Sequence, residues 1–141
     1  MSEHCEIWEP VQGIVSPCAD ISINYGGPDK ASLTMHFSRV RGRPDQDVLL
    51  EFNGLIALRW ESESFSLNPL PEPLPKCTEA DWAGWTFPLL KVSNSLWLER
   101  YSARNPVAAE RRVHYAFTAM NDLVQLLALP EVNARWISGV K

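Results

Sequence analysis

The chain has 141 residues, of which 45% are hydrophobic and 21% charged, and its formal net charge is -4. This size and composition predict one folded, soluble domain that needs no cross-links, and they exclude a disordered chain. The acidic balance argues against nucleic acid as a partner, because contacts with phosphates require a basic surface. No apolar stretch is long enough to span a membrane, so we expect no membrane partner.

Three cysteines, Cys5, Cys18 and Cys77, lie far apart in the sequence and form no CxxC pair. The N-terminus lacks the basic and apolar segments of a signal peptide. Both features are typical of a reducing compartment, so we expect a cytoplasmic protein. The sequence contains no metal-binding histidine pattern and no phosphate-loop or dinucleotide motif, so we expect neither a metal nor another cofactor.

The first predicted elements are β-strands. Apolar residues alternate over residues 21–25 and 33–37, on either side of a Gly-Gly-Pro-Asp sequence, which predicts a β-hairpin. Every second residue from Val48 to Trp60 is apolar or glycine, which predicts a long, half-buried strand. Gly54 marks a bulge or bend that would split this strand into two arms. Short loops between neighbouring strands make an antiparallel meander the simplest topology.

The middle of the chain begins with a proline-rich sequence, NPLPEPLP, at residues 68–75. Repeated proline favours an extended path, so we expect a stiff surface connection that is too short to separate two domains. Residues 78–81 fit a short helical turn, and Phe87 to Val92 fit a buried strand. Ser93-Asn94-Ser95 then provides a cap for a short helix that carries Trp97.

Residues 105–130 fit two different structures. Apolar residues at every third or fourth position predict an amphipathic helix that begins at Asn105-Pro106. Alternation over residues 113–119, a turn at Asn121-Asp122 and an apolar run to Leu129 predict a hairpin instead. Periodicity favours the helix, whereas a family resemblance described below favours the hairpin. In either case residues 132–136 alternate as a last strand. The whole chain, residues 1–141, is therefore predicted to be a single α+β domain, mainly antiparallel sheet with one or two helices packed on it.

Candidate binding residues come from two patterns. Glu61 and Glu63 are two residues apart, so they share one side of the predicted strand end. Paired carboxylates can perform acid–base chemistry when burial raises the pKa of one, but a solvated acidic edge is the simpler interpretation within ESESFS. The other pattern is the excess of tryptophan, with six residues. Trp82 and Trp85 are expected either to cover the sheet or to bind a partner, whereas Trp60 and Trp97 are expected in the core.

Histidine offers little catalytic signal. His114 lies between Arg112 and Tyr115, where we expect a structural histidine rather than a general base. If the chain nevertheless forms a ligand pocket, we expect His114 and Trp97 to belong to it, and the lining to include Trp82, Trp85 and Glu61.

The C-terminal half carries a pattern that resembles a known kind of protein. A hydrophobic-V-x-N-S-x-W-L segment precedes an H-Y-x-F-x-x-x-N-D segment and a closing tryptophan. These positions are Val92, Asn94, Ser95, Trp97, Leu98, His114, Tyr115, Phe117, Asn121, Asp122 and Trp136. Small bacterial proteins that resemble toxin-immunity proteins share this pattern. The resemblance implies an α+β domain with a protein-binding role, and it implies no catalytic residue.

These observations lead to three expectations about function. The first is a non-enzymatic protein-binding domain, an immunity protein that blocks a basic toxin domain through Glu61, Glu63, Trp82 and Trp85. The alternative is a small-molecule-binding protein or an enzyme with an aromatic and acidic pocket at His114 and Trp97. A third is a subunit that self-associates through an exposed strand edge, so that the protein is a monomer or a homodimer.

Overall fold

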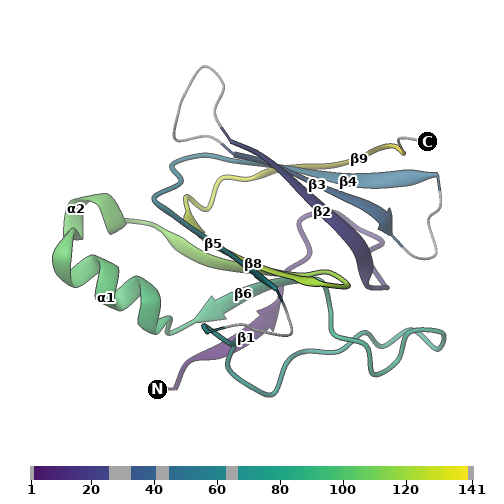
Figure 1. The fold of residues 1–141 in the computed structure, drawn as a ribbon, viewed down its shortest axis with the longest axis horizontal. Coiled ribbons are helices and arrows are strands. Elements are labelled where there is room, and N and C mark those ends of the chain that lie inside the picture. The colour runs from purple at the N-terminus through teal and green to yellow at the C-terminus, as the bar shows by residue number, and fades with distance from the viewer. Residues whose placement is uncertain (1, 26–32, 41–44, 63–66, 140–141) are drawn as a thin grey trace.

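The computed structural model describes residues 2–25, 33–40, 45–62 and 67–139, and these residues form two antiparallel sheets with two short helices (Figure 1). The five-stranded sheet has the order β1 (His4–Ile7), β6 (Leu89–Ser93), β7 (Val113–Thr118), β8 (Asp122–Ala128) and β5 (Ala57–Ser62). The four-stranded sheet has the order β2 (Cys18–Tyr25), β3 (Leu33–Val40), β4 (Gln46–Phe52) and β9 (Asn133–Ser138). The predicted α+β class, mainly antiparallel sheet, is therefore confirmed.

The segment that fitted both a helix and a hairpin is mostly a hairpin. Only α2 (Pro106–Ala109) is helical, with proline in its first turn, and β7 and β8 then pair around a turn that the Ala119 N–H closes on Asp122 O at 3.0 Å. Both strands are buried on both faces. A strand buried on both faces has a nearly continuous apolar sequence, and such a sequence also satisfies the spacing of a helix.

The predicted long strand from Val48 to Trp60 is split at Gly54, as expected, but the single meander is wrong. β2, β3 and β4 form a meander, whereas β5 leaves that sheet and pairs with β8 in the other one. Gly54 has a φ of 63°, which lets the chain turn sharply between the sheets. The crossing is held by backbone hydrogen bonds from Ile56 N to Leu127 O and from Leu129 N to Asn53 O, each 3.0 Å long.

The core lies between the sheets and is centred on aromatic rings. Tyr115 of β7 has its ring centroid 4.7 Å from that of Trp8 and 5.1 Å from that of Phe52 of β4. Phe117 and Phe37 make the next contact across the interface, at 5.5 Å. Each such pair adds about 0.5–1.5 kcal/mol beyond the burial of its surface. Trp60 and Trp97 were both expected in this core. Trp60 is instead 49% exposed on edge strand β5, and Trp97 is only partly buried and lies outside the core, so both predictions are wrong.

The outer face of the five-stranded sheet, which is turned away from the four-stranded sheet, is partly covered by two segments. Helix α1 (Leu96–Arg104) begins after its predicted cap, because Ser95 Oγ accepts a hydrogen bond from Leu98 N at 3.1 Å. The proline-rich segment also lies against this face, since Asn68 O accepts a hydrogen bond from Gln125 of β8. No helix among the described residues is long and apolar enough to cross a membrane.

Gly54→Ala should destabilise the fold by about 2–4 kcal/mol, because it adds both backbone strain and overpacking. A Cβ at Gly54 would lie 2.6 Å from Leu129 Cγ. Gly84 is the matched control, since its φ is also positive, at 91°, but its Cβ would meet nothing within 4 Å. Urea unfolding of both variants measures the difference. Equal losses would show that crowding at the crossing contributes nothing.

Candidate functional site

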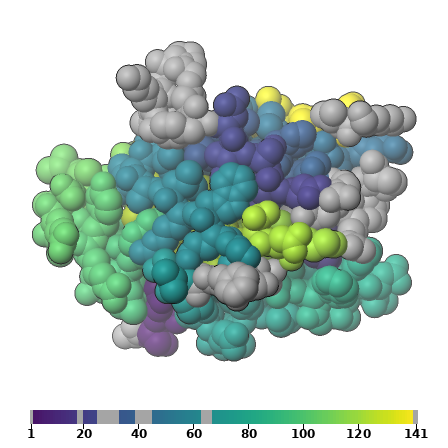
Figure 2. Space-filling model, in the orientation of Figure 1, coloured from purple at the N-terminus to yellow at the C-terminus, as the bar shows by residue number. Residues whose placement is uncertain are grey.

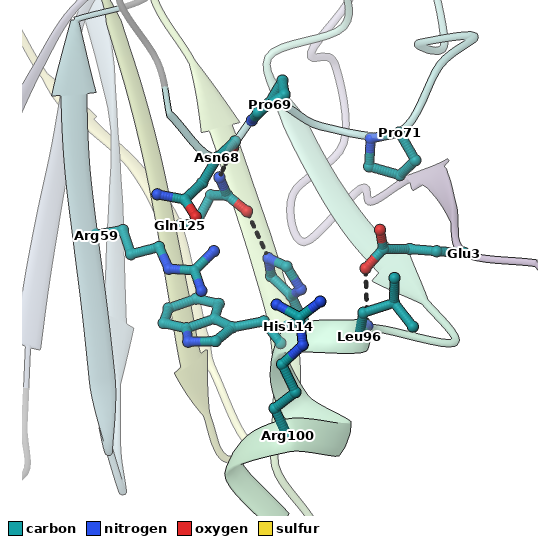
Figure 3. A pocket seen from close by; sticks show the side chains of 10 residues that line it. Glu3, Arg59, Asn68, Pro69, Pro71, Leu96, Arg100, His114 and Gln125 are labelled. Atoms are coloured by element: carbon teal, nitrogen blue, oxygen red, sulfur yellow. Dashed lines mark hydrogen bonds between the residues drawn. The ribbon is translucent and has the colours of Figure 1, made fainter.

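A pocket of about 180 Å³ lies on the outer face of the five-stranded sheet, between α1 and the proline-rich segment (Figure 3). His114 of β7 and Gln125 of β8 form its floor. Its walls come from Arg59 of β5, from Trp97 and Arg100 of α1, and from Glu3, and its rim includes Asn68, Pro69, Pro71 and Leu96. Segments that are far apart in the sequence therefore meet at this site.

The floor is a continuous chain of hydrogen bonds. His114 Nε2 lies 2.8 Å from Gln125 Oε1, and Gln125 Nε2 donates to Asn68 O at 2.8 Å. Because an amide oxygen only accepts, His114 Nε2 must carry the proton, and His114 Nδ1 is then the acceptor. Ser95 Oγ, 2.6 Å away, donates to this nitrogen while it accepts from Leu98 N. Both ring nitrogens of His114 are therefore used within the protein.

Burial sets the charge of this histidine. His114 is buried, and its desolvation lowers its pKa from 6.5 to about 4, although the hydrogen bond to Gln125 opposes the shift. Of the nearby charges, Glu3 favours the imidazolium and Arg59 disfavours it, but desolvation is the largest effect. The imidazole is thus neutral at pH 7, and its hydrogen bonds hold the start of α1 and the proline-rich segment against the sheet. This arrangement agrees with the structural role expected for His114.

Two guanidinium groups point into the pocket, as Figure 3 shows for Arg59 and Arg100. The Arg59 guanidinium carbon lies 3.7 Å from the centre of the Trp97 ring, which is a close cation–π contact. Partial burial lowers the pKa of Arg59. Nearby Glu61 opposes this shift and Arg100 adds to it, and the guanidinium remains charged at pH 7. Glu3 is the carboxylate in the lining, and it accepts a hydrogen bond from Leu96 N at 2.8 Å.

Arg59 and Arg100 differ from three other arginines of the chain. Arg111 forms an ion pair with Glu131, and Arg135 forms one with Glu51. Arg112 donates to two backbone carbonyls, at 2.7 and 2.8 Å. Among the residues that the structure describes, no carboxylate forms an ion pair with Arg59 or Arg100. With two guanidinium groups and one carboxylate in its lining, the pocket is locally basic in an acidic protein.

The structure distributes the predicted site residues over two places. His114 and Trp97 line the pocket together, with ring centroids 5.2 Å apart. Glu61 follows Arg59 on β5, where its carboxylate accepts hydrogen bonds from Leu67 N at 2.7 Å and from the Asn68 side chain at 3.2 Å. Glu63 lies outside the described residues.

The two remaining candidates, Trp82 and Trp85, occupy the loop of residues 76–87. Their ring centroids are 6.3 Å apart in an edge-to-face arrangement. Trp82 packs against the core, whereas Trp85 is 51% exposed. Neither tryptophan belongs to the described lining of the pocket at His114, so these candidates form a separate surface.

The pocket arginines were not predicted from the sequence. Arg59 occupies an ordinary polar position of a strand, and Arg100 an ordinary position of a short helix. One available signal is the spacing of Trp97 and Arg100, which places both on one side of a helix.

Among the described residues, no group of three or more histidine, cysteine, aspartate or glutamate side chains could hold a metal ion. No family model, curated sequence or solved structure matches the chain.

His114 should make the protein less stable as the pH falls from about 6.5 to about 4. In this window the unfolded chain binds a proton that the folded chain excludes, so the free energy of unfolding falls by up to about 3 kcal/mol. His114→Gln should remove this part of the pH dependence, as measured by urea unfolding at pH 7 and pH 5. His4→Gln is the control, because its pKa is shifted upward. If the free energy of unfolding falls equally between pH 7 and pH 5 in the wild type and in His114→Gln, this assignment is contradicted.

Proposed function

We propose that this protein is a non-enzymatic binding protein whose pocket takes a carboxylate or phosphate group of its ligand. One observation carries the proposal. Arg59 and Arg100 line the same pocket, and no described carboxylate forms an ion pair with either of them. Guanidinium groups bind carboxylate and phosphate oxygens through strong, charge-assisted hydrogen bonds.

The surroundings of Arg59 support an anion site. Its guanidinium carbon lies 3.7 Å from the centre of the Trp97 ring, and this contact leaves less side-chain freedom to be lost when a ligand binds. Partial burial also strengthens electrostatic interactions by lowering the local dielectric. The volume of about 180 Å³ is smaller than most sites for whole cofactors, so it fits one acidic end of a ligand.

The proposal includes no reaction. His114 is the imidazole that lines the pocket, and it has both nitrogens in hydrogen bonds and a pKa of about 4. Ser95 Oγ likewise donates to His114 and accepts from the backbone of α1. These groups support a rigid floor beneath a bound anion, which is the arrangement that binding without chemistry requires.

Inorganic phosphate and succinate should each raise the melting temperature of the wild-type protein, because both would bind between the two arginines. Arg100→Leu should weaken binding by about 10- to 100-fold, the effect of losing a charge-assisted hydrogen bond. Isothermal titration measures this change. Comparison of the two probes distinguishes a preference for phosphate from one for carboxylate.

Arg104→Leu is the matched control for this experiment. Arg104 lies on the same helix, four residues after Arg100, but it does not line the pocket. Its removal lowers the net charge by the same amount and should leave binding unchanged. An equal loss in both variants would show a diffuse charge effect, and no binding of either probe by the wild type would refute the proposal.

A second candidate function is the binding of a basic protein partner by the loop of residues 76–87. It is favoured by Trp85, which is 51% exposed and braced by Trp82. Glu79 and Asp81 are exposed in the same loop, so the surface is both acidic and aromatic. Such a surface suits a toxin domain of the kind implied by the resemblance to immunity proteins, since tryptophan is enriched among residues that dominate binding energy.

Trp85→Ala should weaken capture of such a toxin domain by about 30-fold if Trp85 is a binding hot spot. The measurement is affinity capture from the source organism, followed by mass spectrometry and titration of the retained protein. Met120→Ala is the control, because Met120 is a large apolar side chain of similar exposure, 53%, outside this loop. Capture that Trp85→Ala leaves unchanged would argue against this surface.

A further inference from the structure

Strand β5 is the edge of the five-stranded sheet, and it exposes apolar side chains. It follows β8 at the end of the strand order. Leu58 is 39% exposed and Trp60 is 49% exposed, and Figure 2 shows blue-teal atoms of this part of the chain at the surface in the middle of the view. An edge strand presents backbone N–H and C=O groups that can pair with another strand. β5 contains neither proline nor glycine, the two residues that most weaken strand pairing.

We propose that β5 pairs antiparallel with β5 of a second copy of this chain. The charges on the strand favour this pairing. Arg59 lines the pocket on the outer face, and Glu61 shares this face because it is two residues further along. Leu58 and Trp60 lie on the opposite face. In a symmetric dimer, a single pairing register of the two β5 strands must give favourable contacts on both faces of the sheet.

Twofold symmetry leaves few registers to consider. When the twofold axis is normal to the sheet, one residue of β5 lies opposite the same residue of the other copy. The residues on either side then pair symmetrically about it. Within the six residues of β5, only registers centred on Arg59 or Trp60 pair five residues. The register centred on Arg59 places two guanidinium groups opposite each other, which is destabilising.

The register centred on Trp60 is self-complementary. It places Arg59 of each copy opposite Glu61 of the other, so the two cross-strand pairs join unlike charges. It also places the two Trp60 residues opposite each other on the other face, where each indole keeps its hydrogen bond from Nε1 to Asp122 Oδ1 at 3.0 Å and the exposed rings shield each other from water. The strand that best complements this edge is therefore β5 of a second copy of the chain.

Existing contacts of the two charged side chains are compatible with this pairing. Glu61 accepts hydrogen bonds from Leu67 N and the Asn68 side chain, and these hold its carboxylate near the strand. The Arg59 guanidinium lies over Trp97 on the same face of the sheet. Attraction between charges on neighbouring strands acts through space, so it does not require either side chain to leave these partners.

Sedimentation velocity over a range of protein concentrations tests the dimer. The wild type should change from monomer to dimer as its concentration rises. Trp60→Asp would place two carboxylates opposite each other, and Glu61→Arg would place Arg59 opposite an arginine. Each substitution should raise the dimer dissociation constant at least about tenfold. Trp85→Asp is the matched control, since its tryptophan is 51% exposed elsewhere, and it should dimerise like the wild type.

The charge reversal Arg59→Glu with Glu61→Arg makes the test specific. Both positions again meet unlike charges, so the double variant should regain dimerisation although Glu61→Arg alone loses it. Damage to the fold would not be repaired by the second substitution, and circular dichroism checks each variant. A wild type that stays monomeric, or a double variant that does not recover, would overturn the proposal. Arg100→Leu should dimerise normally, which separates this interface from the anion pocket.

Discussion

A chain of hydrogen bonds through the neutral imidazole of His114 is the constraint on which the candidate site depends. It connects Ser95, which caps helix α1, to Gln125 of β8 and onward to Asn68 of the proline-rich segment. Each donor in this chain has one matching acceptor, so burial costs little and the geometry is well defined. Helix α1 is short and has no buried residue, so its position depends on contacts at its first turn. The placement of Trp97 and Arg100 follows from that anchor.

The site shows why net charge is a weak guide to what a protein binds. The chain carries a net charge of -4, which by itself disfavours anionic ligands. The pocket nevertheless collects two guanidinium groups and one carboxylate, and exposed acidic groups such as Glu79 and Asp81 lie in another loop. Electrostatic interactions are screened within about 10 Å at moderate salt, so the local arrangement decides which groups attract a ligand. Acidic and basic surfaces can therefore serve different partners on one small domain.

Much of the secondary structure could be predicted from local patterns. The hairpin of β2 and β3, the break at Gly54, the Ser95 cap and the final strand all follow from alternation, turn residues or capping chemistry. Strand β1 was not predicted, because its four residues are too few to show a period. In the candidate site, His114 and Trp97 were singled out by residue type, whereas Arg59 and Arg100 resembled ordinary surface residues. Arginine becomes informative only when its neighbours are known, because its charge is usually paired or solvated.

The sequence by itself determined the α+β class, the strand segments and the bend at Gly54, because side-chain alternation and glycine conformation are local properties of the chain. Only the tertiary structure decided that the two arms of residues 48–60 belong to different sheets, since strand pairing depends on segments far away in sequence. That decision exposed Trp60 at an edge and turned Arg59 toward Trp97. The pocket and the edge strand therefore both arise from one long-range choice of partner by β5, which no local pattern encodes.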